Sequence, residues 1–264
     1  MKLTSVLPIA ALSLATLAHA ASVQTVLGPL RQRMETSDYR AAGQLVLVDA
    51  SGNRTRYAIR VKGLWFAGAL HVLVDMSPSK AVADRGPQTG QIRLLLELHS
   101  DGRSAIWLFQ PHASAPTRLP LDKWSDRLGG SAISYEDLIE QQYLWPGQTL
   151  LPDANLGARS CNVLQSKPGP SDLTHYSAVT TWLDRTIDYP VYVEKAAKQG
   201  GMVKEFTYSG LRQSSGVWAA TQVEVKIHGR AGATLLTIRR GSAKANLSAQ
   251  DFRFATIAHF EDRP

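Results

Sequence analysis

The stretch Thr221-Gln222-Val223-Glu224-Val225-Lys226-Ile227-His228 places an apolar or β-branched side chain at every second position. The residues between them are charged or polar, which is the pattern of a strand with one buried and one wetter face. Residues 56–62 and 92–98 follow the same period of two. This repeated alternation predicts a mainly β protein.

Turn residues separate the strand-like runs. They gather in residues 49–53, 100–102, 198–201 and 229–232, where Gly, Asp, Asn or Ser stand between two apolar runs. Connections this short are hairpins, so we expect a mainly antiparallel, meandering sheet. Residues 45–48, 64–66 and 106–109 are apolar on both faces. This favours a strongly curved sheet with helices or loops covering one side.

Two segments have helical signals. A short helix is expected around residues 23–34. A second is expected over residues 134–144, where Ser134 can serve as N-cap and Pro146-Gly147 ends the helix. Glu136 and Asp137 would then lie in its first turn, near the positive end of the helix dipole.

Composition narrows the class of protein. The 264 residues are 44% hydrophobic and 19% charged, which excludes a disordered chain and a coiled coil. A single Cys excludes an intramolecular disulfide framework and zinc fingers. Lys+Arg exceed Asp+Glu by 29 to 22, a modest basic excess. With no linker of disordered composition and no internal repeat, residues 21–264 are expected to form one domain.

The first twenty residues are typical of a secretory signal peptide. Met1-Lys2 is a short positive start, residues 3–17 are mostly apolar, and Ala18-His19-Ala20 supplies small residues at the cleavage site. We therefore expect cleavage after Ala20 and export to the periplasm, with no nucleic acid as partner. No Cys stands at the expected cleavage point, so a lipoprotein anchor is not predicted.

Catalytic motifs are scarce. Ser77-Pro78-Ser79-Lys80 matches the spacing S-x-x-K, but Pro78 favours a loop and no K-T-G follows. Glu136 and Asp137 are neighbours, and neighbours on a helix point apart. The histidines are scattered and lack metal-ligand spacing. The sequence therefore predicts no enzyme, no catalytic residue, no cofactor and no metal; a hydrolase using Ser77 and Lys80 is the weakest alternative.

A more specific signal comes from the order of three segments. Residues 90–96 are followed by Trp107-Leu108-Phe109-Gln110-Pro111 and then by Gly129-Gly130-Ser131-Ala132-Ile133-Ser134-Tyr135-Glu136-Asp137-Leu138. This series resembles the outer-membrane lipoprotein-sorting family, the LolA-like proteins. Later segments, such as Trp182-Leu183-Asp184, look like that family's later strands. Phe109 stands where the family usually has Tyr, and no counterpart of its lid-latching arginine is evident.

The resemblance implies a half-open antiparallel β-barrel, with a few helices forming a lid over an apolar cavity. It also implies a periplasmic carrier that holds acyl chains of lipoproteins or other lipids. Its partners would be an inner-membrane lipid or lipoprotein exporter and an outer-membrane acceptor. The predicted cavity-lining, lipid-binding residues are Trp65, Leu94, Leu96, Trp107, Phe109 and Trp182. Tyr135, Glu136 and Asp137 are the predicted lid-positioning residues.

One alternative of a different class stays open. A binding or sensor module of the cell envelope, which recognises a partner protein or a mislocalised lipoprotein without transferring it, would have the same signal peptide and strands. That interpretation predicts a solid core and an exposed sheet edge or patch, whereas a carrier requires a hollow concave face.

Overall fold

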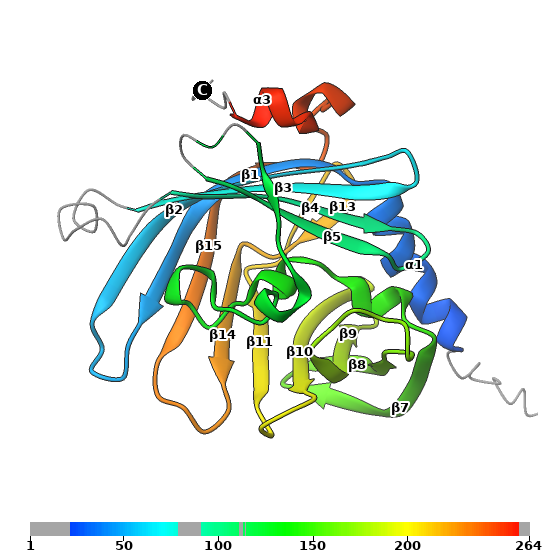
Figure 1. The fold of residues 1–264 in the computed structure, drawn as a ribbon. Coiled ribbons are helices and arrows are strands. Elements are labelled where there is room, and N and C mark those ends of the chain that lie inside the picture. The colour runs from blue at the N-terminus through cyan, green and yellow to red at the C-terminus, as the bar shows by residue number, and fades with distance from the viewer. Residues whose placement is uncertain (1–21, 79–90, 111–112, 114, 259–264) are drawn as a thin grey trace, which may run out of the picture.

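The computed structural model describes residues 22–78, 91–110, 113 and 115–258. Thirteen strands form one curved antiparallel sheet (Figure 1). In chain order, the strands of this sheet are β1 (Asp38–Val48), β2 (Arg54–Phe66), β3 (Ala69–Pro78), β4 (Ile92–His99), β5 (Ser104–Phe109), β6 (Thr117–Arg118), β7 (Gly147–Leu156), β8 (Arg159–Lys167), β9 (Tyr176–Asp184), β10 (Tyr189–Ala197), β11 (Val203–Ser209), β14 (Gln222–Ile227) and β15 (Ala233–Ser242). A separate hairpin joins β12 (Arg212–Ser214) to β13 (Val217–Ala219).

The strand order explains how the concave face is filled. Across the sheet the order is β6-β5-β4-β3-β2-β1-β15-β14-β11-β10-β9-β8-β7, so β6 and β7 are the two edges although they are consecutive in the chain. Residues 119–146, here called the crossing segment, must therefore pass from one edge to the other. The segment carries the 3-10 helices η1 (Leu121–Lys123), η2 (Leu128–Gly130), η3 (Tyr135–Leu138) and η4 (Gln141–Leu144). Figure 1 shows it in front of the sheet.

The main hydrophobic core lies between the sheet and the crossing segment. Buried side chains from the strands include Leu45, Ile59, Val74, Leu94, Leu96, Ile106, Val193 and Phe206, and those from the crossing segment include Trp124, Leu128, Ile133, Ile139 and Trp145. Burial of a large apolar side chain contributes about 1.5–3 kcal/mol to folding. The crossing segment is thus part of the core rather than a loose cover.

Helix α1 (Val23–Glu35) begins at Ser22, whose side chain accepts a hydrogen bond from the Thr25 amide at 3.1 Å. Its buried residues Leu27 and Leu30 pack with Tyr143 in a second cluster, which also contains Leu164 and Leu183 of β8 and β9. The helix predicted around residues 23–34 is therefore confirmed.

A third cluster lies on the opposite, convex face of the sheet. There η5 (Ala249–Phe252) and α3 (Phe254–Ala258) bring Phe252 and Ile257 onto Leu73 and Leu95. This contact explains why some strands are apolar on both faces: the crossing segment covers one side and the C-terminal helices cover the other (Figure 1).

The four predicted hairpins are confirmed as β1–β2, β4–β5, β10–β11 and β14–β15. The single helix predicted over residues 134–144 is wrong. Ser134 does cap a helix, but the backbone is extended at Ile139 (φ −118°, ψ 132°), which separates η3 from η4. Ile139 is buried in the main core, so packing overrides the local helical signal. The fold is mainly β, a half-open antiparallel barrel.

Candidate functional site: a charged anchor beside an open pocket

Asp137 fixes the crossing segment to the sheet. Its side chain is 0% exposed, and its two oxygens lie 3.0 Å from Nζ of Lys195 on β10 and 2.7 Å from Nζ of Lys204 on β11. The hydroxyl of Tyr176 on β9 donates a further hydrogen bond at 2.6 Å. Three neighbouring strands thus bind one carboxylate of the crossing segment.

The same carboxylate also shapes its own turn. Ser134 donates hydrogen bonds to Asp137 from its backbone N–H and from Oγ, both at 2.8 Å, which closes a capping box around η3. Burial alone would raise the pKa of Asp137, but the ammonium groups of Lys195 and Lys204 outweigh burial and hold the pKa well below its ordinary value. Asp137 is therefore ionised at neutral pH.

Two further contacts hold the crossing segment. The buried carboxylate of Glu136 accepts hydrogen bonds from the His175 amide at 3.1 Å and from Oγ1 of Thr174 at 3.3 Å. Near η2, the Ala132 amide donates to Oγ1 of Thr234 on β15 at 2.8 Å. These contacts join the segment to the residues before β9 and to β15, the middle strand of the sheet.

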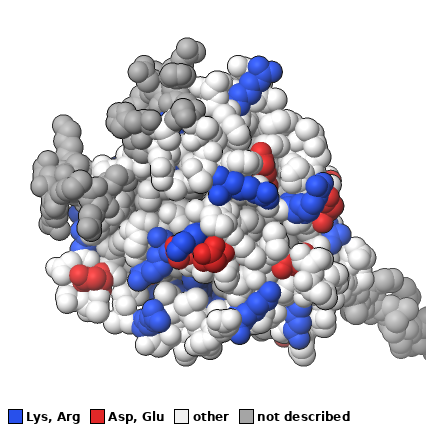
Figure 2. Space-filling view, viewed as in Figure 1, with Lys and Arg blue, Asp and Glu red and all other residues white. Residues whose placement is uncertain are grey.

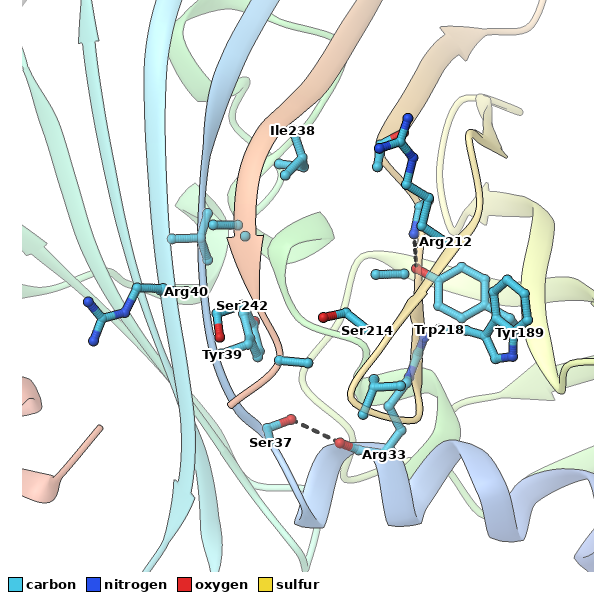
Figure 3. A pocket seen from close by; sticks show the side chains of 18 of the residues that line it. Arg33, Ser37, Tyr39, Arg40, Tyr189, Arg212, Ser214, Trp218, Ile238 and Ser242 are labelled. Atoms are coloured by element: carbon cyan, nitrogen blue, oxygen red, sulfur yellow. Dashed lines mark hydrogen bonds between the residues drawn. The ribbon is translucent and has the colours of Figure 1, made fainter. Parts of the chain in front are cut away.

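A pocket of about 1180 Å³ remains beside the crossing segment. It lies between α1, the ends of β1 and β15, and the β12–β13 hairpin (Figure 3). Its apolar lining residues include Met34, Val61, Leu70, Val72, Leu138 and Ile238. Pockets that bury small ligands measure about 300–1,000 Å³, so this one has room for a sizeable apolar group.

One wall of the pocket depends on a glycine. The ring of Tyr39 lies across Gly63 of β2, so close that a Cβ at position 63 would be 2.2 Å from the ring's Cε1 atom. The missing side chain lets Tyr39 lie against the sheet. Tyr39 is itself a pocket-lining residue.

The other end of the pocket is polar and aromatic. Arg33 of α1 pairs with Glu140 at 2.6 Å and lies 5.0 Å from the centre of the Tyr189 ring. Tyr208 meets Tyr189 edge-on, with ring centres 6.3 Å apart. The Tyr189 hydroxyl accepts a hydrogen bond from the Ala220 amide at 3.1 Å, which joins the residue just after the β12–β13 hairpin to β10. Figure 3 shows Tyr39 and Tyr189 on opposite sides of this space.

Three of the six predicted cavity-lining residues lie on the concave side. Leu94 and Leu96 are fully buried in the main core, and Trp65 packs against the same core. None of the three lines the pocket of Figure 3. With the crossing segment in place, Leu94 and Leu96 are covered.

The other three lie on the convex side. Trp107 and Phe109 alternate with the inward-packed Leu108, and they belong to the cluster beneath the C-terminal helices. Trp182 packs edge-on against Tyr192, with ring centres 5.0 Å apart. Its neighbour Leu183 packs inward, so Trp182 points the other way. These side chains are therefore placed away from the concave pocket.

The predicted lid-positioning residues do lie together on η3. The carboxylates of Glu136 and Asp137 bind the sheet as described, and Tyr135 packs against the main core. Sequence reasoning missed their partners Lys195 and Lys204. The signal was present, because each Lys continues an inward-facing apolar series, after Val191 and Val193 in one strand and before Phe206 in the other.

Metal binding, catalysis by Ser77 and Lys80, and membrane-spanning helices were also considered for the described part of the chain. No group of three or more His, Cys, Asp or Glu side chains there is placed to hold a metal ion. Ser77 lies on β3, whereas Lys80 is outside the described residues. None of the helices among residues 22–78, 91–110 and 115–258 is both long and apolar enough to cross a membrane. Figure 2 shows Lys and Arg side chains scattered among uncharged and acidic ones on the viewed face.

Comparison with known proteins agrees with the architecture. The model of a protein family described as uncharacterized protein-like matches residues 86–258. The chain belongs to this family. No curated protein matches the chain.

Several solved structures share the fold. A domain described as an outer membrane lipoprotein-sorting protein from Vibrio parahaemolyticus is similar with a TM-score of 0.76 and 20% identity, over 90% of this chain and 100% of that one. A DUF1329 family protein from Desulfovibrio piger is similar with a TM-score of 0.74 and 16% sequence identity, over 89% of this chain and 97% of that one. A LolA superfamily protein from Nitrosomonas europaea is similar with a TM-score of 0.62 and 16% sequence identity, over 89% of this chain and 98% of that one. The fold of this chain is LolA-like.

Proposed function

We propose that the chain is a periplasmic carrier that binds lipids or lipoproteins, holds their acyl chains in the pocket and transfers them towards the outer membrane. The observation that carries the proposal is the pocket of about 1180 Å³, lined in part by apolar side chains of the sheet, beside the crossing segment that packs into the main core. A protein that used this fold only as a scaffold would have no need of the hollow part.

The apolar walls can supply the binding energy. Transfer of one acyl CH₂ group from water to an apolar site contributes about 0.8 kcal/mol, so a chain of about a dozen carbons binds without specific polar contacts. Val61, Leu70 and Val72 come from adjacent strands and form a continuous surface for such a chain. An acyl contact with Leu94 or Leu96 requires the crossing segment to move, because it covers both residues.

Two further observations support a periplasmic lipid carrier. Residues 1–20, outside the described residues, have the pattern of a leader cleaved after Ala20, which supports export to the periplasm. The similar domain from Vibrio parahaemolyticus is described as a lipoprotein-sorting protein. An inner-membrane exporter and an outer-membrane acceptor are the partners that this proposal requires, and no nucleic acid, cofactor or catalysis is part of it.

The test is binding of a neutral, pyrene-labelled alkyl alcohol to the purified mature chain, followed by fluorescence. We expect saturable binding, and Val61→Trp should weaken it by about tenfold or more because the indole occupies acyl space. Ala58→Trp is the matched control, since Ala58 lies on the same strand, is exposed and does not line the pocket. Absence of saturable binding, or equal weakening by both variants, would contradict the proposal.

The proposal also includes transfer of a bound lipid between membranes. A carrier should move a bound lipid from donor to acceptor vesicles faster than the lipid moves alone. A binding or sensor module of the envelope would bind the probe or a partner protein and leave this rate unchanged. Vesicle transfer followed by energy transfer between lipid labels therefore separates the two functions.

A further inference from the structure

The pocket is lined by several hydrogen-bond donors that have no partner within the described chain. The hydroxyls of Tyr39 and Tyr208 make no hydrogen bond with other described residues, and the same is true of the Arg212 guanidinium on β12. All three residues line the pocket, and Figure 3 shows Arg212 on the hairpin beside it. Burial raises the pKa of Tyr39 and Tyr208, so both hydroxyls keep their protons.

The acceptors in the pocket are mostly occupied. Glu140 is paired with Arg33, and Asp137 with the two lysines. Asp38 accepts hydrogen bonds from the amides of Asn246 and Leu247 at 3.0 Å. Asp188, on the exposed turn before β10, is the remaining acidic residue of the lining. A ligand that enters therefore meets free donors rather than free carboxylates in the interior.

From this placement we propose that the polar end of the pocket binds the anionic head group of an amphiphile, a phosphate or a carboxylate, through Arg212 and the hydroxyl of Tyr208. The inference rests on the proposed function, because the apolar walls must hold the tail. It goes further by assigning the chemical class of the head group.

The arrangement suits such a molecule. Val61 and Val72 belong to β2 and β3. Tyr208 belongs to β11, which β1, β15 and β14 separate from β2 in the sheet, and Arg212 belongs to the hairpin, so tail and head would occupy different parts of the pocket. Tyr208 packs on Tyr189, which in turn lies over Arg33, so its hydroxyl is held in place by aromatic contacts. Arg212 is exposed on the hairpin, and a hydrogen bond from its guanidinium to an anion is stronger than one between neutral groups.

The test is displacement of the neutral pyrene-labelled alcohol from the mature chain by dodecyl phosphate, dodecanol and dodecyltrimethylammonium at equal tail length. We expect dodecyl phosphate to displace the probe at about tenfold lower concentration than dodecanol, the effect of one charge-assisted hydrogen bond. The cationic compound should be the weakest. Arg212→Gln and Tyr208→Phe should each reduce the preference for phosphate over alcohol. Arg230→Gln, the same charge change on an exposed turn away from the pocket, should not.

The outcomes separate the two proposals. If the neutral probe does not bind at all, the proposed carrier function fails. If the probe binds but phosphate and alcohol compete equally, or if Arg212→Gln and Arg230→Gln behave alike, the head-group assignment is overturned and the carrier function stands. If inorganic phosphate alone displaces dodecyl phosphate at similar concentration, the site is one for a free anion, which also overturns the assignment. Circular dichroism of each variant verifies that it is folded.

Discussion

The concave face of the sheet has two parts that differ in how they are filled. One part is occupied by the crossing segment, whose apolar side chains complete the core and whose Asp137 joins β9, β10 and β11. The other part, between α1, β1, β15 and the β12–β13 hairpin, remains a pocket of about 1180 Å³. We expect substitutions in the filled part to lower the unfolding free energy, and substitutions in the hollow part to weaken ligand binding.

Asp137→Asn should have the largest effect on the stability of the filled part. The substitution keeps the shape of the side chain but leaves the buried ammonium groups of Lys195 and Lys204 without their carboxylate. Removal of one partner from a buried ion pair costs about 3–5 kcal/mol of unfolding free energy, measured by urea denaturation. Asp126→Asn is the control in the same segment, because its pair with Lys123 is exposed; it should cost less than about 1 kcal/mol. Equal losses would show that the anchor does not stabilise the filled part.

Acid should remove the same stabilisation gradually. The pKa of Asp137 is lower in the folded protein than in the unfolded chain, so its contribution is complete above the unfolded value near 4 and is lost as pH falls towards the folded value. Between the unfolded and the folded pKa values, the loss should be about 1.4 kcal/mol per pH unit. The difference in unfolding free energy between wild type and Asp137→Asn should therefore shrink as pH falls. A difference that stays constant with pH would contradict this assignment.

At the border of the hollow part, Gly63→Ala should have an intermediate effect. The new methyl group would overlap the Tyr39 ring, and overpacking of this kind costs about 1–3 kcal/mol. In a Tyr39→Ala background the same substitution should cost little, since the ring is gone. A double-mutant cycle on the unfolding free energy measures this coupling. Without coupling, Gly63 would not be what allows Tyr39 to lie on the sheet.

Much of the sheet was predictable from local sequence. The turn residues near Gly52 and Gly232 predicted two of the hairpins, and Ser134 was recognised as a cap. The path of the crossing segment was not predictable, because it follows from β6 and β7 being opposite edges of the sheet, which depends on pairings far apart in sequence. For the same reason Trp107 and Phe109 were assigned to the cavity: a strand that is apolar on both faces does not reveal which face is concave.

The hollow part was harder to predict because its residues come from segments with weak patterns. Tyr39, Tyr208 and Arg212 line one pocket only because of the fold, and the short β12–β13 hairpin carries no strong alternation. In the filled part, Lys195 and Lys204 were missed although the sequence carried a signal for them. A charged residue in an inward-facing series requires a buried partner, so their positions would have predicted the anchor once the strands were paired.

The smallest expected effect on stability belongs to Trp218→Ala in the β12–β13 hairpin. Trp218 is only partly buried and lines the pocket, and the hairpin forms its own two-stranded sheet outside the large one. We expect a loss of less than about 1 kcal/mol in unfolding free energy, well below that of Asp137→Asn. Binding of the neutral pyrene-labelled alcohol should nevertheless weaken, because part of the pocket wall is removed. If Trp218→Ala instead destabilises the fold as strongly as Asp137→Asn and leaves probe binding unchanged, the division between a stabilising filled part and a binding hollow part is wrong.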